Sequence, residues 1–260
     1  MAQLGGIGHH HQTMDDPVET AAALARRVAA LPDADMRVAY VRHELRRHPP
    51  ELVVDIVAIA ANLTESKIPP NQELLLAISL ALADEVADDL RLAALGVAAS
   101  RGQRDVVLLL SRRSIGDDDT PDDKLVPDFG RGRPLTLGER KSLARTRDRD
   151  LLMRVLRDPH PDVITILLGN PMLTEENIVR LAARRPIAPS ILRLVFRSTR
   201  WIVRYRVRRV LCLNPNTPLD VSLALVRHLT DADRRLVYSS TELPDEIRRA
   251  SEVRDPPLLH

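Results

Sequence analysis

The sequence predicts an all-α protein organised around a helical-repeat α-solenoid, and three observations support this fold class. First, a threonine and a proline recur along the C-terminal half every 25–31 residues, a spacing typical of stacked helical repeats. They are Thr146, Thr174, Thr199 and Thr230, and Pro161, Pro189, Pro218 and Pro244. Second, no stretch of useful length alternates apolar and polar residues as a strand does. Third, aromatic residues make up only 2% of the chain, which favours helices packed through aliphatic side chains.

The two repeated residue types suit helix starts. A threonine hydroxyl can accept from a free backbone N–H of the first turn, and proline fits the first helical position, where its missing N–H costs nothing. Thr217-Pro218-Leu219-Asp220 combines both signals, with an acid at the third helical position as in a capping box. Apolar segments follow at 163–168, 191–195 and 221–226. Each is too short to be stable alone, so we expect neighbouring units to bury them.

The N-terminal half also reads as helical, but with only loose repetition. We expect a flexible tail over 1–16. The His9-His10-His11 triplet in this tail is not used to predict the fold. A lobe of about six helices follows over 17–113, with helix starts or breaks at Pro17, Asp33, Pro49-Pro50 and Pro69-Pro70. The later helices of this lobe are expected at 51–63, 71–84, 90–99 and 105–111.

A charged linker is expected between the two halves, over 114–134. Its first part is a run of acids around Asp117-Asp118-Asp119 without apolar anchors, and its second part is basic and rich in glycine. A solvated connection explains this composition better than a calcium loop, because the central glycine and closing glutamate of an EF-hand are missing. Thr136 and Glu139 then form a predicted capping box that opens the C-terminal lobe, 135–254.

Composition narrows the class of protein. The chain is 44% hydrophobic and 28% charged, as globular proteins are. The single cysteine, Cys212, cannot build a disulfide framework and fits a reducing compartment, so we expect a cytoplasmic protein with Cys212 as a small buried apolar residue. The most apolar runs, 52–63 and 74–83, are shorter than the roughly 20 residues that span a bilayer. We therefore expect no membrane span.

Charge is distributed unevenly along the chain. Up to residue 134 there are 15 Lys and Arg against 21 Asp and Glu, a net charge of −6. From residue 135 onwards there are 23 against 15, a net charge of +8. Such asymmetry is typical of a docking surface between the two halves or of attraction to an acidic partner. An uneven solvated surface explains it equally well.

Two short motifs support a family resemblance. Asn170-Pro171-Met172-Leu173-Thr174 and Asn214-Pro215-Asn216-Thr217-Pro218 each precede a helix rich in Val, Leu or Ala. They resemble leucine-rich variant repeats, a family of HEAT-like α-solenoids, over about 146–250. The resemblance implies a curved helical stack that binds macromolecules. The motifs lie 44 residues apart and at different places within the Thr-to-Pro units, which leaves the repeat register open.

Neither the resemblance nor the residues predict a cofactor or a reaction. Leucine-rich variant proteins can carry an N-terminal cysteine cluster for an iron–sulfur centre, but Cys212 alone cannot supply one. Phosphate-binding loops, nucleophile elbows and His-Glu-x-x-His motifs are absent from the sequence. His43 and His48 are poorly spaced as paired metal ligands, and the acids at 84–89 read as a solvated helix junction. We expect a protein that is not an enzyme, without a metal site.

The most informative local feature is an arginine segment at 193–209. It contains seven arginines together with Trp201 and Tyr205. A single helix starting near Arg200 would place Trp201, Tyr205 and Cys212 on one face, flanked by arginines. Two interpretations stay open: the aromatic residues are core of the next layer, under arginine stems, or they form an interface hot spot. The candidate partner-binding residues are Arg193, Arg197, Arg200, Trp201, Arg204, Tyr205, Arg208 and Arg209.

Two functions of different classes follow. The leading one is a non-enzymatic adaptor or regulator that binds another protein with an acidic contact surface, for instance a signalling protein such as a small GTPase or its regulator. The alternative is a helical-repeat protein that binds nucleic acid through its basic C-terminal half. The negative N-terminal half and the scarcity of aromatic residues favour the first.

Overall fold

The structure, a computed structural model, describes residues 16–64, 69–111 and 125–252. These ranges contain helices and no β-strand, so the predicted all-α fold class is confirmed. None of the helices found there combines the length and apolar character that crossing a bilayer requires. Of the expected tail, only Asp16 belongs to the described residues. Its carboxylate caps the first helix by accepting from the backbone N–H of Val18.

Residues 16–64 and 69–111 form an N-terminal lobe with six α-helices, the number expected from the sequence, and one 3-10 helix. They are α1 (Pro17–Ala30), α2 (Ala34–Leu45), α3 (Pro50–Thr64), α4 (Pro69–Ala83), the short 3-10 helix η1 (Glu85–Ala87), α5 (Asp88–Ser100) and α6 (Arg104–Leu110). α4 lies at the centre, packed by α1, α2 and α3. Residues 74–83 are buried almost all round, which explains why this helix is apolar on every side rather than along one stripe.

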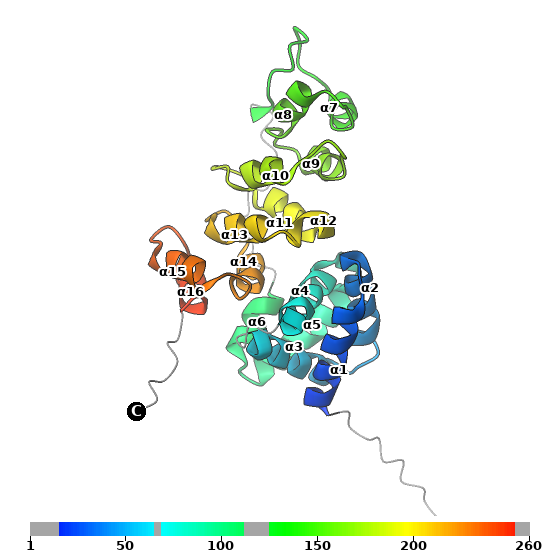
Figure 1. The fold of residues 1–260 in the computed structure, drawn as a ribbon, viewed down its shortest axis with the longest axis vertical. Coiled ribbons are helices and arrows are strands. Elements are labelled where there is room, and N and C mark those ends of the chain that lie inside the picture. Colours follow the sequence, from blue (N-terminus) through cyan, green and yellow to red (C-terminus); the bar gives the residue numbers. More distant parts are fainter. Residues whose placement is uncertain (1–15, 65–68, 112–124, 253–260) are drawn as a thin grey trace, which may run out of the picture.

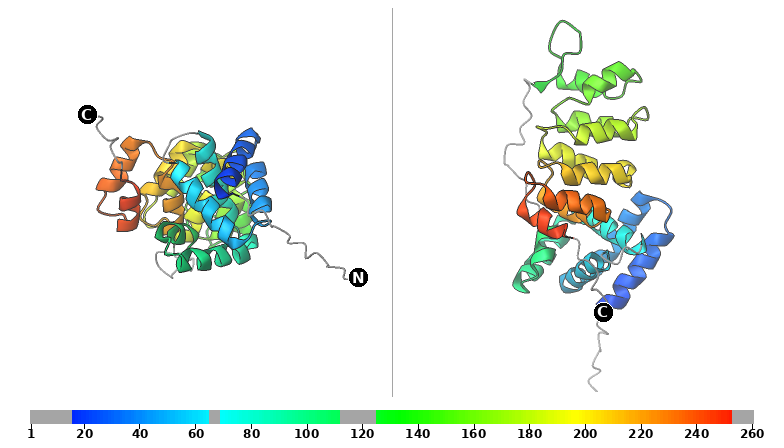
Figure 2. Two further views of the ribbon diagram at one scale, coloured as in Figure 1. Left: turned by 90° about the horizontal axis from the view of Figure 1, so that it is seen from below. Right: turned by 60° about the vertical axis from the view of Figure 1, so that its left-hand side comes forward.

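Residues 125–252 form a stack of short helices, seen edge-on in the right-hand view of Figure 2. They are α7 (Leu137–Leu143), α8 (Arg149–Val155), α9 (Pro161–Leu168), α10 (Glu175–Ala182), α11 (Pro189–Arg197), α12 (Thr199–Ile202), α13 (Tyr205–Leu213), α14 (Leu219–Val226), α15 (Asp231–Ser239) and α16 (Asp245–Ala250). α7, α9 and α11 pack as a first row, and α10, α13 and α15 as a second row. Helices this short are unstable alone in water, so packing between layers holds them.

The lobe and the stack meet at α14, which packs against α13 on one side and against α4 and α6 on the other. Seven of its eight residues are buried. α11 also contacts α4, and α12 contacts α2. The N-terminal lobe thus covers one end of the stack, whereas α7 and α8 form the opposite, free end (Figure 1).

The repeated prolines lie at helix starts, as the periodicity predicts. Pro161 and Pro189 are the first residues of α9 and α11. Pro218 and Pro244 stand one residue earlier, as the N-caps of α14 and α16. Because proline has no N–H to satisfy and a preset φ, either position suits it.

The threonines divide into two groups. Thr174 and Thr230 cap α10 and α15 through their hydroxyls, and Thr136 forms the predicted capping box with Glu139. Thr199, in contrast, is the first residue of α12, and Thr146 lies ahead of Asp148, which caps α8 instead. The threonine period therefore marks the N-caps of α8, α10, α12 and α15 only to within two residues.

The combined signal at Thr217 to Asp220 is the exception, and the predicted capping box there is wrong. The Thr217 hydroxyl donates to the carbonyl of Leu211 at 2.7 Å, and α14 has no side-chain cap. Asp220 accepts instead from both terminal nitrogens of Arg193, at 2.6 and 2.9 Å. The local cap is replaced because the buried Thr217 hydroxyl bonds back to α13 and the Asp220 carboxylate pairs with Arg193 on α11.

The predicted linker, 114–134, is only partly within the described residues, since 114–124 lie outside them. Its second half packs on the stack: Phe129 is buried, and the carbonyl of Asp128 accepts from the Arg154 guanidinium at 3.0 Å. A buried phenylalanine provides the apolar anchor that a solvated connection would lack.

A buried asparagine ties the second layer of the stack to the first. Asn170 follows α9, and its amide nitrogen donates to the carbonyls of Ala144 and Thr146, both at 2.9 Å. Its amide oxygen accepts from the backbone N–H of Met172 at 2.8 Å. One side chain thus closes its own turn and also satisfies two carbonyls at the end of the neighbouring helix, α7.

The second Asn-Pro motif does the same in the other row. Asn214 follows α13, and its amide nitrogen donates to the carbonyls of Ala182, the last residue of α10, and of Arg184 just after it, at 2.7 and 2.9 Å. Its amide oxygen accepts from the N–H of Asn216. The two motifs occupy different places in the Thr-to-Pro units because one closes a first-row helix and the other a second-row helix.

A buried ion pair also links two neighbouring layers of the stack, near its free end. Arg140 on α7 donates to both carboxylate oxygens of Asp158, at 3.0 and 3.2 Å. The side chains are 5% and 0% exposed. Asp158 also accepts from the backbone N–H of His160, just ahead of α9. This pair links the first two layers of the stack.

Candidate functional site

The arginine segment does not form the single helix that the sequence suggested. α12 ends at Ile202, and α13 begins at Tyr205, with Arg204 in an extended conformation as its N-cap. The break turns Val203 outwards, where it is 43% exposed, although a continuous helix would have placed it on the apolar face with Val207. The predicted grouping of aromatic residues on one helix face is therefore wrong.

Trp201 belongs to the core. Its side chain is 2% exposed, and its indole N–H donates to the carbonyl of Leu168 at 2.8 Å. The Arg200 guanidinium lies 4.4 Å from the centre of the indole ring and donates to the carbonyl of Asn170 at 3.1 Å. Of the two interpretations left open by the sequence, the structure supports packing for this residue.

Tyr205 is half-buried and joins α13 to α15. Its hydroxyl interacts with the carboxylate of Asp233 and accepts from the backbone N–H of Thr230 at 3.1 Å. Arg209 donates to the other oxygen of Asp233 at 2.7 Å. Burial acts to raise the pKa of Asp233, but the hydrogen bonds that its carboxylate receives from Arg209 and Tyr205 outweigh burial and lower this pKa. Tyr205 and Arg209 therefore serve contacts between layers.

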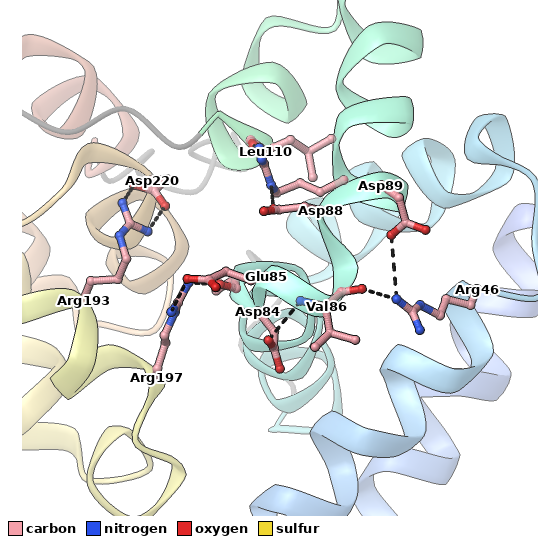
Figure 3. A network of polar contacts seen from close by, with 12 residues as sticks. Arg46, Asp84, Glu85, Val86, Asp88, Asp89, Leu110, Arg193, Arg197 and Asp220 are labelled. Carbon is pink, nitrogen blue, oxygen red and sulfur yellow. Dashed lines mark hydrogen bonds and ion pairs between the residues drawn. The ribbon is translucent and has the colours of Figure 1, made fainter. Parts of the chain in front are cut away.

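Two further candidates lie at the junction between the stack and the N-terminal lobe (Figure 3): Arg193 joins two helices of the stack, and Arg197 joins the stack to the lobe. Arg193 makes the forked pair with Asp220 described above, and Arg197 on α11 donates to the carbonyl of Ala83 and pairs with Glu85 at 3.9 Å. Nearby, the Thr199 hydroxyl donates to Asp35 of α2 at 2.6 Å. The junction is therefore fixed by polar contacts as well as by α14.

The junction encloses a cavity of about 30 Å³ lined by side chains that include Ile78, Phe196, Ala224 and Arg91. A space of this size holds about one water molecule. The Arg91 guanidinium beside it already donates to Asp88 and to the carbonyl of Leu110. This cavity therefore offers no room for a substrate.

What is left on the surface of the arginine segment is a strip that we call the edge surface: Arg200, Val203, Arg204 and Arg206. Arg204 pairs with Glu175 at 3.4 Å and Arg206 with Glu176 at 2.8 Å, and both arginine side chains are about half exposed. The bond from Arg206 lowers the pKa of Glu176. Sequence reasoning left Arg206 out of the candidate residues, although its place among the seven arginines was visible.

A second basic surface lies at the free end of the stack. Four exposed arginines there, the free-end arginines, are Arg131, Arg147, Arg149 and Arg157. Their guanidinium groups form no hydrogen bond or ion pair with any residue that the structure describes. The carboxylate of the neighbouring Asp148 is occupied in capping α8. Sequence reasoning found only the overall basic charge of this half.

Cys212 is fully buried, as expected from the sequence. Burial raises the pKa of its thiol, which suppresses the reactive thiolate. Across residues 16–64, 69–111 and 125–252, no three His, Cys, Asp or Glu side chains come together as a metal ion would require.

Comparison of the chain with family models, with curated proteins and with solved structures finds no match.

Proposed function

We propose that this chain is a non-enzymatic protein-binding adaptor or regulator, built on a HEAT-like α-solenoid of the leucine-rich variant type. The layered helices, the two equivalent Asn-Pro closures and the recurring prolines support the repeat assignment. Repeat stacks work by presenting an extended surface that the fold holds rigid. The partner that we expect has an acidic contact surface. Small GTPases and their regulators are one class of such signalling proteins.

The observation that carries this proposal is the edge surface. It combines exposed arginines with an exposed valine, and protein interfaces favour this mixture of guanidinium and apolar groups. Arg200 and Arg204 both lie over Trp201, within 5.6 Å of its ring centre, so the core holds their positions. Preorganised side chains lose less entropy when a partner binds.

Reversing two charges of the edge surface is expected to remove partner binding without unfolding the protein. Exposed ion pairs contribute only about 0–1 kcal/mol to stability, so Arg204→Glu with Arg206→Glu should change the melting temperature little. Affinity capture with the wild-type and variant proteins, quantified by mass spectrometry, should show at least a ~10-fold loss of specific partners.

The matched control is Arg147→Glu with Arg149→Glu, which makes the same charge change at the free end. It should retain the partners that the edge-surface variant loses. If both variants capture the same proteins as the wild type, the edge surface is not the binding site. If only the control loses them, the contact lies at the free end.

Nucleic-acid binding is the second candidate function, and the free-end arginines favour it. Guanidinium groups without an internal carboxylate are available for phosphate oxygens. A short DNA duplex titrated by fluorescence anisotropy across a salt series should then bind with a steep negative salt dependence. Arg147→Glu with Arg149→Glu should reduce the slope by about 2, whereas the edge-surface variant should keep it. Absence of binding at about 50 mM salt would reject this candidate.

A further inference from the structure

A cavity of about 400 Å³ opens on the N-terminal lobe, between α1 and the C-terminal part of α2. Its lining includes three acids, Asp16, Glu19 and Glu44, together with Tyr40 and Leu24. This volume lies within the range of clefts that take a ligand, roughly 300–1,000 Å³. We call this cavity the acidic groove.

The acids of the groove are only partly compensated within the chain. Glu19 is exposed and forms no hydrogen bond or ion pair with any residue that the structure describes. Asp16 uses one carboxylate oxygen to cap α1. Glu44 pairs with Arg47 at 3.3 Å, but this arginine is 65% exposed, so the pair is weak. The groove therefore offers carboxylates, and the ring of Tyr40, to a cationic side chain.

The free-end arginines carry the opposite charge at the other end of the molecule. Asp148 is occupied in capping α8, and the exposed Asp150 balances only part of their charge. α1 and the pair α7 and α8 lie at opposite ends of the longest axis (Figure 1). The acidic groove and the free-end arginines are thus too far apart to meet within one copy of the chain.

The arginine segment does not compete for the groove. Six of its seven arginines already donate to a carboxylate or a backbone carbonyl of their own chain. The seventh, Arg208, is half-buried and lies over the ring of Tyr205, 6.0 Å from the ring centre. The free-end arginines have neither kind of contact, so an acidic surface gains most by binding there.

The two parts of the molecule differ in charge in the same sense. The described residues of the N-terminal lobe contain 13 Asp and Glu against 9 Arg, a net charge of −4. Those of the stack contain 15 Asp and Glu against 24 Lys and Arg, a net charge of +9. When two copies meet, unlike ends attract each other and like ends repel.

We propose that copies of this chain assemble head to tail, with the free-end arginines of one copy seated in the acidic groove of the next. The two contact surfaces differ, so each added copy leaves one groove and one set of arginines unfilled. Such a heterologous contact produces an open chain, or a ring where the rotation closes. The proposal does not rest on the adaptor role, because the edge surface takes no part in this contact.

Sedimentation velocity of the nuclease-treated, full-length protein tests the assembly. At about 0.1 M salt the average mass should rise with protein concentration to more than about twice the 29.1 kDa of one chain. At about 1 M salt it should return to the mass of one chain, because the screening length falls from ~10 Å to ~3 Å.

Two variants each remove one side of the contact. Glu19→Lys with Glu44→Gln changes the groove, and Arg147→Glu with Arg149→Glu changes the free end. Each variant alone should stay a monomer at low salt. The matched control is the edge-surface variant, Arg204→Glu with Arg206→Glu, which should assemble as the wild type does.

Mixing the two variants decides whether the contact is the proposed one. The groove variant still carries its arginines, and the arginine variant still carries an intact groove. Equal amounts should therefore form dimers and nothing longer, because each dimer ends in two altered surfaces. If the groove variant does not fold, as judged by circular dichroism, the exposed substitution Glu19→Lys replaces it in the mixture.

A wild-type protein that stays monomeric at low salt overturns the proposal, and so does a mixture without dimers. Assembly that occurs only before nuclease treatment would assign the free-end arginines to nucleic acid instead. Neither outcome changes the result expected for the edge-surface variant in the capture assay, so this proposal and the adaptor role can fail separately.

Discussion

Replacing Trp201 by alanine is expected to lower the free energy of unfolding by about 3–5 kcal/mol, the range for large-to-small core substitutions. The indole is among the largest fully buried side chains of the described residues. Its loss leaves a cavity between α9 and α12 and also leaves the Leu168 carbonyl without the indole N–H. Urea denaturation followed by circular dichroism measures the change.

Two controls accompany this substitution. Tyr238→Ala removes an aromatic side chain that is 52% exposed on α15, and should cost less than about 1 kcal/mol. Since Trp201 is the single tryptophan, its emission in the wild type should also be that of an indole shielded from water. If Trp201→Ala lowers the free energy of unfolding by less than about 1 kcal/mol, Trp201 is not a core residue and belongs to the candidate partner-binding surface.

Asp158→Ala is the second substitution with a large expected effect, again about 3–5 kcal/mol. It removes the carboxylate partner of a guanidinium that is itself almost completely buried. It also frees the backbone N–H of His160 ahead of α9. Thermal and urea unfolding should both show the loss, because the first two layers of the stack share this pair.

A double-mutant cycle separates the pair from its surroundings. Arg140→Leu with Asp158→Leu should be more stable than either single variant, because no unpaired charge stays buried. Asp162→Ala is the exposed counterpart: its pair with Lys141 spans 2.7 Å, but the carboxylate is 57% exposed, so about 0–1 kcal/mol is expected. Equal losses for Asp158→Ala and Asp162→Ala would contradict the assignment of a buried pair.

Sequence reasoning found the helices well because their starts are encoded locally. Asp33, Thr136 and Pro189 act on the backbone within three residues of their own position. Such signals do not depend on which helix packs next to which. The Asn-Pro motifs were also visible in the sequence, but the hydrogen bonds from Asn170 and Asn214 to carbonyls 24–32 residues earlier could not be predicted from it.

The candidate site was harder to predict because its residues are positioned by distant partners. The partners of Arg197 and Thr199 lie in the N-terminal lobe, over 100 residues away. The break at Val203 and the burial of Trp201 likewise depend on the neighbouring layer, in which the Leu168 carbonyl at the end of α9 accepts from the indole N–H. A prediction from helical periodicity assumes that a segment is one continuous helix with one face towards solvent. The arginine segment is broken between α12 and α13 and is packed by neighbouring layers, so neither assumption holds for it.

The junction between lobe and stack also bears on how the chain reaches its folded state. Contacts inside the stack join residues about one repeat apart, and such local contacts form quickly. The bonds at the junction join residues that lie 114 to 166 positions apart, as between Arg227 and the carbonyl of Ala61. Closing loops of that length costs entropy before any contact compensates. We therefore expect the docking of α14 onto α4 and α6, which joins the stack to the N-terminal lobe, to be the slow step of refolding, after both parts have gained their helices.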